Sequence, residues 1–331
     1  MDPVRVGVIG LRMGRAHAAA YHKLESAELA VICDRDEQRL AEVAAEVGSP
    51  ATCTSGEALL ARDDLDAVVV AVPDNFHAPL TVAALQSGRH VLCEKPMAPT
   101  WQECLDMYRA SQRSGRKLMI GQSYRFRQPF HAAKQAAVSG ELGEVFYVES
   151  QYWNNLEGVG GIGNWRNDPA IRHPFIGGVH ALDLTRFIAG DIVAVSAYAN
   201  HLAFAEQPTD DCIIAQLSFA SGAVGRALVS SGCKCPFVTT LCIYGTAGSV
   251  DTNRICRAKG ETKRDWQWEP LPQPELPDSI LAESVAFIDS IVSDAEPPVS
   301  GRDNLQTMAA CFAVVESAAK GGEPIEVAKI D

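Results

Sequence analysis

The sequence predicts an α/β protein: a Rossmann-type, doubly wound parallel sheet at the N-terminus, then a C-terminal α+β domain with an open, mainly antiparallel sheet. Three observations predict this. Short apolar runs alternate with helical periods up to Ser123, face-alternating runs dominate from Glu144 onward, and 331 residues correspond to about two domains at roughly 150 residues each. We therefore expect domains at residues 1–123 and 124–331.

Five short apolar runs of the first domain are typical of β-strands. They are Val4–Ile9, Leu29–Cys33, Ala67–Val72, His90–Cys93 and Lys117–Gly121. The apolar spacing from Leu40 to Val47 predicts a helix between two of them, and the capping box Thr100–Glu103 opens another, which Gly115 ends. Repeated strand–helix–strand units need crossovers, which give parallel strands with helices on both faces.

Strand-length runs of the second domain follow a further helix expected over residues 128–139. They are Glu144–Trp153, Ile192–Asn200, Asp211–Ala220, Ala223–Ser231 and Val238–Tyr244. Short turns such as Ala220–Gly222 join them, so we expect an antiparallel meander. The proline-rich segment Pro270–Pro277 predicts an extended connector, and two amphipathic helices, able to pack back on the first domain, close the chain.

The composition excludes several classes of protein. A formal net charge of −12 disfavours nucleic acid and anionic membranes as partners. The longest strongly apolar run, Ala67–Val72, is far shorter than the ~18 residues of a membrane span, and MDPVRVGVIG lacks a secretory pattern, so we expect a soluble, cytoplasmic protein. Ten cysteines are too dilute for a disulfide scaffold, and Cys233 and Cys235 lack the spacing of a zinc site, so no metal is expected.

A glycine-containing turn, GVIGLRMGRAH, joins the first strand to the first helix. Bare backbone amides and a helix N-terminus at this place suit a dinucleotide's pyrophosphate. The expected contacts are Gly10, Leu11, Arg12, Met13 and Gly14. Arg12 stands where a G-x-G-x-x-G run has its second glycine, so a tight turn that binds nothing is the alternative.

Asp34 closes the second strand, where an acid accepts the ribose hydroxyls of a dinucleotide. Its carboxylate repels a 2′-phosphate, which favours NAD over NADP. Arg35 beside it could instead accommodate that phosphate or stack on adenine, so NADP is kept as the alternative cofactor.

Several motifs bear on function together. A strand ends at Pro73, Asn75 and His77 follow, and the next strand closes with Glu94-Lys95-Pro96. Further motifs are GQSYRF at Gly121–Phe126, Trp165-Arg166, GGVHALD at Gly177–Asp183 and YGTAGSV at Tyr244–Val250. This combination resembles the Gfo/Idh/MocA family of sugar and polyol oxidoreductases, with an Asn-to-His gap one residue shorter than in many members. The resemblance implies cofactor contacts from Val72, Pro73, Asn75, His77, Glu94 and Lys95.

Lys95 and His180 are the expected catalytic residues. At the carboxyl end of a parallel strand, Lys95 could hydrogen-bond a reacting hydroxyl and stabilise its oxyanion; a solvated lysine is the alternative. His180 is expected to begin a helix, whose N-terminus would keep the imidazole neutral as a base, and Asp183 one turn later could fix its tautomer. The alternative for His180 is a capping or packing role.

One position departs from the family pattern. Members that oxidise polyols usually carry Asp four residues before this histidine, where this chain has Ile176. We expect Asp183 or the loop acid Asp168 to compensate in proton transfer, or a different proton route.

The segment after Tyr152 is rich in Asn, Trp, Arg and Gly, which suits a hydroxyl-rich ligand. The expected substrate contacts are Tyr124, Arg125, Trp153, Asn154, Trp165, Arg166 and His180. An ordered connector with a tryptophan anchor is the alternative, and Tyr124 and Arg125 could instead brace the domain junction.

These features predict an NAD-linked oxidoreductase that transfers hydride between nicotinamide and a secondary hydroxyl or ketone of a cyclic polyol, sugar or sugar derivative. In the oxidative direction His180 removes the hydroxyl proton and Lys95 stabilises the alkoxide. Two alternatives stay open: an NAD-dependent glycoside hydrolase on the same scaffold, and a non-catalytic dinucleotide-binding regulator. The open sheet needs a covered face, which by the resemblance implies a homodimer or homotetramer.

Overall fold

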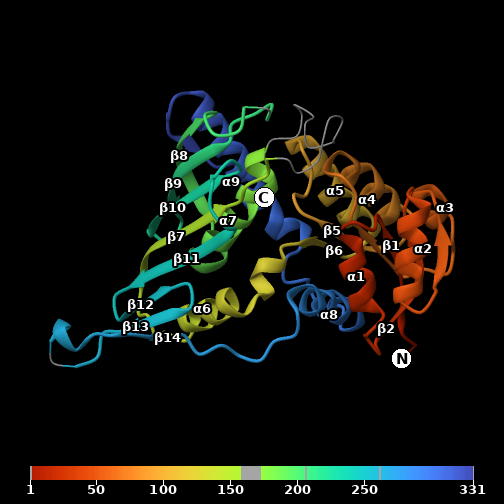
Figure 1. Cartoon of the computed structure of the whole chain (residues 1–331), viewed down its shortest axis with the longest axis horizontal. Coiled ribbons are helices and arrows are strands. Elements are labelled where there is room, and N and C mark those ends of the chain that lie inside the picture. The colour runs from red at the N-terminus through yellow and green to blue at the C-terminus, as the bar shows by residue number, and fades with distance from the viewer. Residues whose placement is uncertain (1, 158–172, 206, 261, 331) are drawn as a thin grey trace. The chain divides into compact units, whose positions relative to one another are not determined.

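The computed structural model describes residues 2–157, 173–205, 207–260 and 262–330, with the backbone alone at 173–176. The chain forms two compact units, whose elements are labelled in Figure 1. Unit 1 consists of Met1–Ser123 and Pro277–Leu305, and unit 2 of Tyr124–Leu276 and Gln306–Asp331. Unit 1 is therefore discontinuous in sequence, because a segment near the C-terminus completes it.

Unit 1 is built on a six-stranded parallel sheet in the order β3-β2-β1-β4-β5-β6. The strands are β1 (Val4–Ile9), β2 (Ala27–Cys33), β3 (Ala51–Cys53), β4 (Ala67–Val70), β5 (His90–Glu94) and β6 (Leu118–Gly121). The helical elements are α1 (Gly14–Tyr21), α2 (Glu37–Glu46), α3 (Gly56–Leu60), η1 (Asp74–Phe76), α4 (His77–Gln86), α5 (Trp101–Ser114) and α8 (Ser279–Val292). This arrangement confirms the predicted Rossmann-type sheet.

The central strands of unit 1 are buried on both faces, as their continuous apolar runs predict. Val6, Val68 and Leu92 have no exposed surface, and α1 packs against α8 within this unit. The capping box predicted at Thr100 and the left-handed glycine that ends α5 are both present. The sequence does not predict β3, since this three-residue edge strand is mostly exposed and carries no apolar run.

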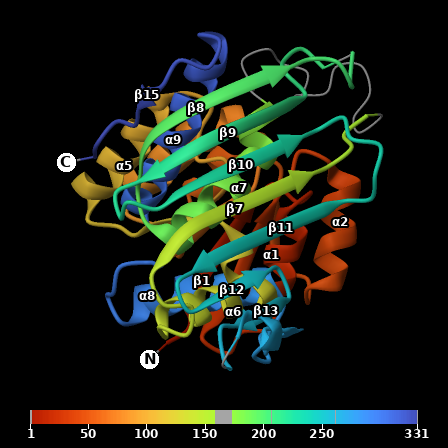
Figure 2. The same ribbon diagram turned by 90° about the vertical axis from the view of Figure 1, so that its left-hand side faces the viewer.

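Unit 2 contains a nine-stranded sheet in the order β14-β13-β12-β11-β7-β10-β9-β8-β15, which Figure 2 shows nearly face-on. The strands are β7 (Val145–Trp153), β8 (Ile192–Asn200), β9 (Cys212–Phe219), β10 (Val224–Ser230), β11 (Val238–Gly245), β12 (Gly248–Asp251), β13 (Arg254–Arg257), β14 (Trp268–Pro270) and β15 (Ile325–Glu326). Its helical elements include α6 (Gln128–Val138), α7 (His173–Ala189) and η4 (Lys263–Asp265). Two further elements, η2 (Ser123–Phe126) and α9 (Gly301–Ala319), begin in the sequence of unit 1 and continue into that of unit 2.

The sheet is mainly antiparallel, as expected, but the predicted simple meander is wrong. Strand β7 is the first strand of this sheet in the sequence, yet it lies between β11 and β10 and pairs with β10 in parallel. Alternating hydrophobicity identifies a strand and its buried face without specifying its neighbours, because pairing depends on contacts distant in sequence.

The expectation that His180 begins a helix is also wrong, because α7 begins at His173, two turns earlier. Gly177 and Gly178 lie inside the helix rather than before it. A Cβ at Gly177 would lie 2.6 Å from Tyr152 Cε1, and one at Gly178 would lie 3.1 Å from Val229 Cγ2. The glycine pair therefore lets α7 pack closely on β7 and β10, instead of breaking the helix.

Within the residues that the structure describes, none of the helices combines the length and apolar character needed to cross a lipid bilayer.

Candidate functional site

The carboxyl ends of the strands of unit 1 bring the predicted cofactor residues to one edge of its sheet. Gly10 follows β1, Asp34 follows β2, Val72 and Pro73 follow β4, and Lys95 follows β5. Since all these strands are parallel, their carboxyl ends share one edge, which is where open α/β sheets bind ligands.

The turn from Gly10 to Gly14 requires its glycines. Gly10 has φ +85°, and a Cβ there would lie 2.4 Å from the carbonyl oxygen of Ala71; a Cβ at Gly14 would lie 2.9 Å from Val8 Cγ1. Arg12 and Met13 are exposed at the tip of the turn, while Leu11 is buried beneath it. The turn therefore passes close to β4 with backbone exposed at its tip, which fits a pyrophosphate cradle at the start of α1.

Asp34 is held in place by two backbone amides and one guanidinium. Its Oδ2 accepts from the amide of Leu11 at 2.7 Å, and its Oδ1 accepts from that of Asp36 at 2.9 Å. The Arg39 Nη1 lies 3.1 Å from both oxygens. Burial would raise the pKa of Asp34, but these amides and Arg39 hold it below its ordinary value. Asp34 therefore stays ionised beside the glycine turn.

Arg39 is a residue that the sequence analysis missed. It lies on α2, and its Nη2 also donates to Asp36 Oδ2 at 2.8 Å. Arg35, the basic residue singled out from the sequence, is exposed. The available signal was the position of Arg39 in the first turn of the helix that follows Asp34. Asp36 caps that helix, so its first turn lies next to the acid.

His77 is buried, with both ring nitrogens against main-chain carbonyls. Nδ1 lies 2.8 Å from the Pro96 oxygen, and Nε2 lies 2.9 Å from the Val72 oxygen. Burial alone would lower the pKa of His77, but Cys93, Asp74 and the Pro96 carbonyl raise it to about 10. His77 therefore ties together the chain segments that leave β4 and β5.

The remaining predicted residues of this edge differ in exposure. Asn75 is exposed, Val72, Pro73 and Lys95 are half-buried, and Glu94 is buried. Lys95 is thus able to present its ammonium to a bound molecule, whereas Glu94 faces the interior.

Unit 2 carries His180 in an aromatic cluster. The ring of Tyr124 stacks on His180 with centroids 4.1 Å apart and planes inclined by 5°, and Tyr152 lies 6.1 Å away. The Arg127 guanidinium lies 4.1 Å from the Tyr124 ring. His180 is 4% exposed. The imidazole plane is therefore fixed by stacking, and Tyr152 and Arg127 join the predicted residues around it.

Asp183 and Arg125 form a buried ion pair in unit 2. The Arg125 Nε donates to Asp183 Oδ2 at 2.8 Å and its Nη2 donates to Oδ1 at 2.7 Å, while the Thr307 hydroxyl donates to Oδ1 at 2.9 Å. These bonds occupy both carboxylate oxygens, so the structure gives Asp183 a bracing role and weakens its assignment as a proton relay.

Trp153 lies on the other face of β7 from Tyr152, because successive strand residues alternate. Its indole N–H donates to Gln151 Oε1 at 2.9 Å. The backbone N–H of Asn154 donates to the Ser230 carbonyl at 2.9 Å. Tyr152, and not Trp153, lies on the side of β7 that contacts His180. The assignment of Trp153 to substrate binding stays a prediction. Trp165, Arg166 and Asp168 lie outside the described residues, as does the side chain of Ile176.

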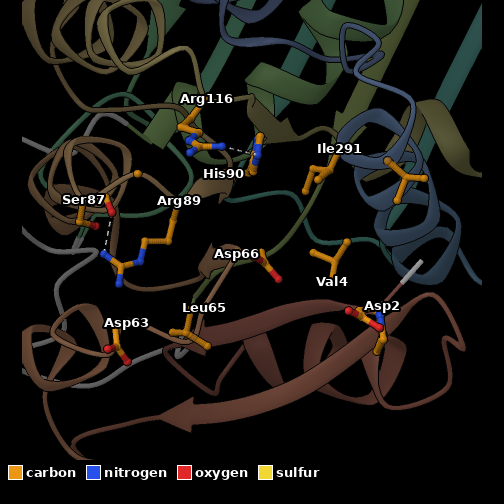
Figure 3. Close-up of a pocket in the computed structure, with 13 residues that line it drawn as sticks. Asp2, Val4, Asp63, Leu65, Asp66, Ser87, Arg89, His90, Arg116 and Ile291 are labelled. Carbon is orange, nitrogen blue, oxygen red and sulfur yellow. Dashed lines mark hydrogen bonds between the residues drawn. The ribbon is translucent and has the colours of Figure 1, made fainter.

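A pocket of about 710 Å³ in unit 1 lies away from the carboxyl edge of the parallel sheet (Figure 3). Val4 at the start of β1 and His90 at the start of β5 line it, so it lies at the amino ends of the strands. Arg116 approaches His90 Nε2 to 3.4 Å, and Arg89 donates to the Ser87 carbonyl. Acidic and basic side chains are mixed in its wall, and we assign it no cofactor role.

The parallel sheet, the glycine turn and the ionised acid beside it define unit 1 as a dinucleotide-binding Rossmann domain. Comparison with known proteins identifies its family. Residues 4–122 match the model of an oxidoreductase family with an NAD-binding Rossmann fold, and residues 130–251 match the GFO/IDH/MocA C-terminal domain. The chain belongs to the Gfo/Idh/MocA family of oxidoreductases, which confirms the resemblance seen in its motifs.

Relatives match along most of this chain. D-apiose dehydrogenase of Rhizobium rhizogenes is 29% identical over 91% of this chain and 91% of its own length. D-xylose 1-dehydrogenase (NADP(+)) 2 of Haloferax volcanii is 30% identical over 89% and 90%. The fold is shared with levoglucosan dehydrogenase in complex with NADH, at a TM-score of 0.89 and 24% identity over 99% of this chain and 100% of that one.

A partial match is to a glycosyl hydrolase family 109 protein of Shewanella pealeana. It is 31% identical over 50% of this chain and 40% of that protein.

Proposed function

We propose that this protein is an NAD-linked dehydrogenase, or reductase in the opposite direction, acting on a secondary hydroxyl or the matching ketone of a sugar, cyclic polyol or sugar derivative. The observation that carries the proposal is the similarity to sugar dehydrogenases over about nine-tenths of the chain. The carboxyl edge of unit 1 supports it, since it combines a glycine turn, an ionised acid and a half-buried lysine.

The residues of unit 1 fit a dinucleotide, because the turn that Gly10 and Gly14 allow has an exposed tip at the start of α1 and lies beside the ionised Asp34. We assign the turn to the pyrophosphate, Asp34 to the adenosine ribose, and Val72, Pro73 and Asn75 to the nicotinamide half. His77 supports this edge through its two carbonyl contacts. When bound, the nicotinamide accepts or supplies the hydride.

Lys95 and His180 are the proposed catalytic residues. In oxidation, the imidazole of His180 takes the hydroxyl proton, and the Lys95 ammonium donates a hydrogen bond to the same oxygen as negative charge develops on it. Stacking on Tyr124 holds the imidazole plane, and the Arg125–Asp183 pair braces α7 behind it. Asn154, Trp165, Arg166 and Asp168 remain proposed substrate or proton-transfer residues.

The experiment is a panel of D-apiose, D-xylose, levoglucosan, 1,5-anhydro-D-fructose and myo-inositol, each with NAD⁺ and NADP⁺ or with the reduced cofactor for ketones, followed at 340 nm. Turnover of at least one compound is expected. Lys95→Ala and His180→Ala are each expected to lower kcat by about 10²–10⁴-fold with little change in NAD⁺ affinity. Wild-type rates in either variant would remove that residue from the mechanism.

The glycoside hydrolase alternative has weaker support, because its relative matches half of this chain. Release of a free sugar from an aryl glycoside without net NADH formation would favour it over the dehydrogenase. Tight NAD⁺ binding with neither reaction would favour the regulator.

We further propose that a second copy of the chain covers the open face of the unit 2 sheet. This face lies opposite α7 and exposes large apolar side chains on neighbouring strands: Tyr198, Ile214, Val224 and Tyr244. Light scattering after size exclusion is expected to give a dimer or tetramer, and Val224→Asp is expected to shift it toward the monomer. A monomeric wild type would refute this proposal.

A further inference from the structure

A buried histidine and a buried glutamate lie directly behind the proposed catalytic lysine. His17 of α1 has no exposed surface, and Glu94, the last residue of β5, is 7% exposed. His17 Nε2 lies 3.0 Å from Glu94 Oε1, the distance of a hydrogen bond that the imidazole donates and the carboxylate accepts. None of the sequence motifs singles out His17.

The second oxygen of Glu94 reaches the chain of Lys95. Its Oε2 accepts from the backbone amide of Lys95 at 3.2 Å. Gly121 of the neighbouring β6 makes room for this arrangement, since a Cβ there would lie 3.3 Å from both Cα and Cδ of Glu94. The carboxylate is therefore fixed on one side by α1 and on the other by the peptide that carries the lysine.

Titratable groups from two helices and from the next residue of the chain surround Glu94. His17 comes from α1, Glu283 comes from α8 with its carboxylate within 4.8 Å of the other two groups, and Lys95 follows on the chain. Burial would raise the pKa of Glu94, but His17 and Lys95 hold it below its ordinary value. Attraction between the carboxylate and the Lys95 ammonium is mutual, so an ionised Glu94 favours the charged form of the lysine.

We propose that Glu94, anchored by His17, is a positioning residue for Lys95: it fixes the lysine's main chain and keeps its side chain a hydrogen-bond-donating ammonium. The inference rests on the proposed function only for the role of Lys95 in turnover. The geometry of the pair and its effect on the lysine's charge stand independently of any substrate.

The test is competitive acetylation of the wild type and Glu94→Gln with acetic anhydride across pH 7–11, read by peptide mass spectrometry with NAD⁺ binding as the check of folding. Only the uncharged amine reacts. Glu94→Gln is therefore expected to label at Lys95 about tenfold faster at pH 8, which corresponds to one pK unit. Glu46→Gln, which removes the partner of Arg15 on the same α1, is the matched control and is expected to leave Lys95 labelling unchanged.

Equal Lys95 labelling in the wild type and in a Glu94→Gln variant that binds NAD⁺ would overturn the proposal. If Glu94→Gln does not fold, the double variant His17→Gln/Glu94→Gln takes its place, because both members of the pair become neutral together. The wild type alone supplies a further check: a labelling midpoint for Lys95 below that of exposed Lys23 would also refute the proposal.

Turnover adds a second readout that a general loss of stability would not reproduce. With the best sugar of the panel, Glu94→Gln is expected to lower kcat by about 10–100-fold with KM for NAD⁺ nearly unchanged, and to shift the alkaline fall of kcat to lower pH. In a Lys95→Ala background the same substitution is expected to have no further effect on kcat. A protein that turns over no sugar would refute the proposed function while the labelling experiment still decides this inference.

Discussion

Replacing Asp183 by Ala tests whether the buried ion pair of unit 2 braces α7. The substitution removes three hydrogen bonds, two from Arg125 and one from Thr307, and leaves a guanidinium whose side chain is 8% exposed without its carboxylate. Removing one partner of such a pair costs about 3–5 kcal/mol, a large part of the roughly 5–15 kcal/mol that stabilises a typical domain. With a urea m-value of about 2 kcal/mol/M, the unfolding midpoint should fall by roughly 2 M.

The assay is urea unfolding followed by tryptophan fluorescence. Four of the five tryptophans belong to unit 2, so fluorescence reports mainly on that unit. The matched control is the double variant Arg125→Met/Asp183→Leu, which exchanges the pair for apolar side chains and is expected to recover most of the lost stability. A loss of less than about 1 kcal/mol of unfolding free energy in Asp183→Ala would refute the reasoning, because removing the carboxylate should leave the Arg125 charge buried and unpaired.

Three further predictions concern unit 1. Gly10→Ala is expected to weaken NAD⁺ binding more than tenfold by calorimetry, since its Cβ would lie 2.4 Å from the Ala71 oxygen in a backbone of φ +85°, and unchanged affinity would contradict the turn assignment. Arg39→Met leaves Asp34 unmatched, so NADP⁺ affinity is expected to fall about tenfold more than NAD⁺ affinity, with Arg35→Met as the control. Burial, Arg116 and Lys117 lower the pKa of His90 from 6.5 to about 4. The unfolded chain therefore binds a proton at His90 more readily than the folded chain does. The contribution of neutral His90 to the free energy of unfolding is complete above pH 6.5 and is lost as the pH falls toward 4, by about 1 kcal/mol after solvent screening. His90→Gln is expected to flatten that part of the stability–pH curve, and an NMR titration of His90 near 6.5 would disprove it.

Elements buried on both faces could be predicted from the sequence, because their signal is local. The run Ala67–Val72 is continuous and apolar, and the run Val4–Ile9 is apolar apart from Arg5 and Gly7; each contains a central strand. The edge strand Ala51–Cys53 carries no such signal, since it buries little. The place of β7 between β10 and β11 could not be predicted, because strand order is decided by packing between distant segments.

The same distinction between local signals and contacts distant in sequence applies to the candidate site. Gly10 and Asp34 stand next to strand ends in the sequence, so their position at the carboxyl edge follows from the fold class. Arg39, His17 and Tyr152 were missed, because each acts through a neighbour that only the folded chain brings close. The start of α7 at His173 was not predicted, and the glycine pair before His180 lies inside the helix, where Gly177 packs closely on Tyr152.

The discontinuity of unit 1 has a consequence for synthesis on the ribosome. Helix α8 packs on α1, and the chain at Ser300 bridges to Met119 of β6, yet both partners from the C-terminal segment are translated after all of Tyr124–Leu276. During translation of Tyr124–Leu276, the nascent Rossmann sheet therefore lacks α8 and the segment at Ser300, and the surface of α1 that packs against α8 stays uncovered. A gene fragment that stops at residue 123 would therefore yield a sheet with exposed apolar surface, and a fragment for expression should rejoin Pro277–Leu305 through a short linker.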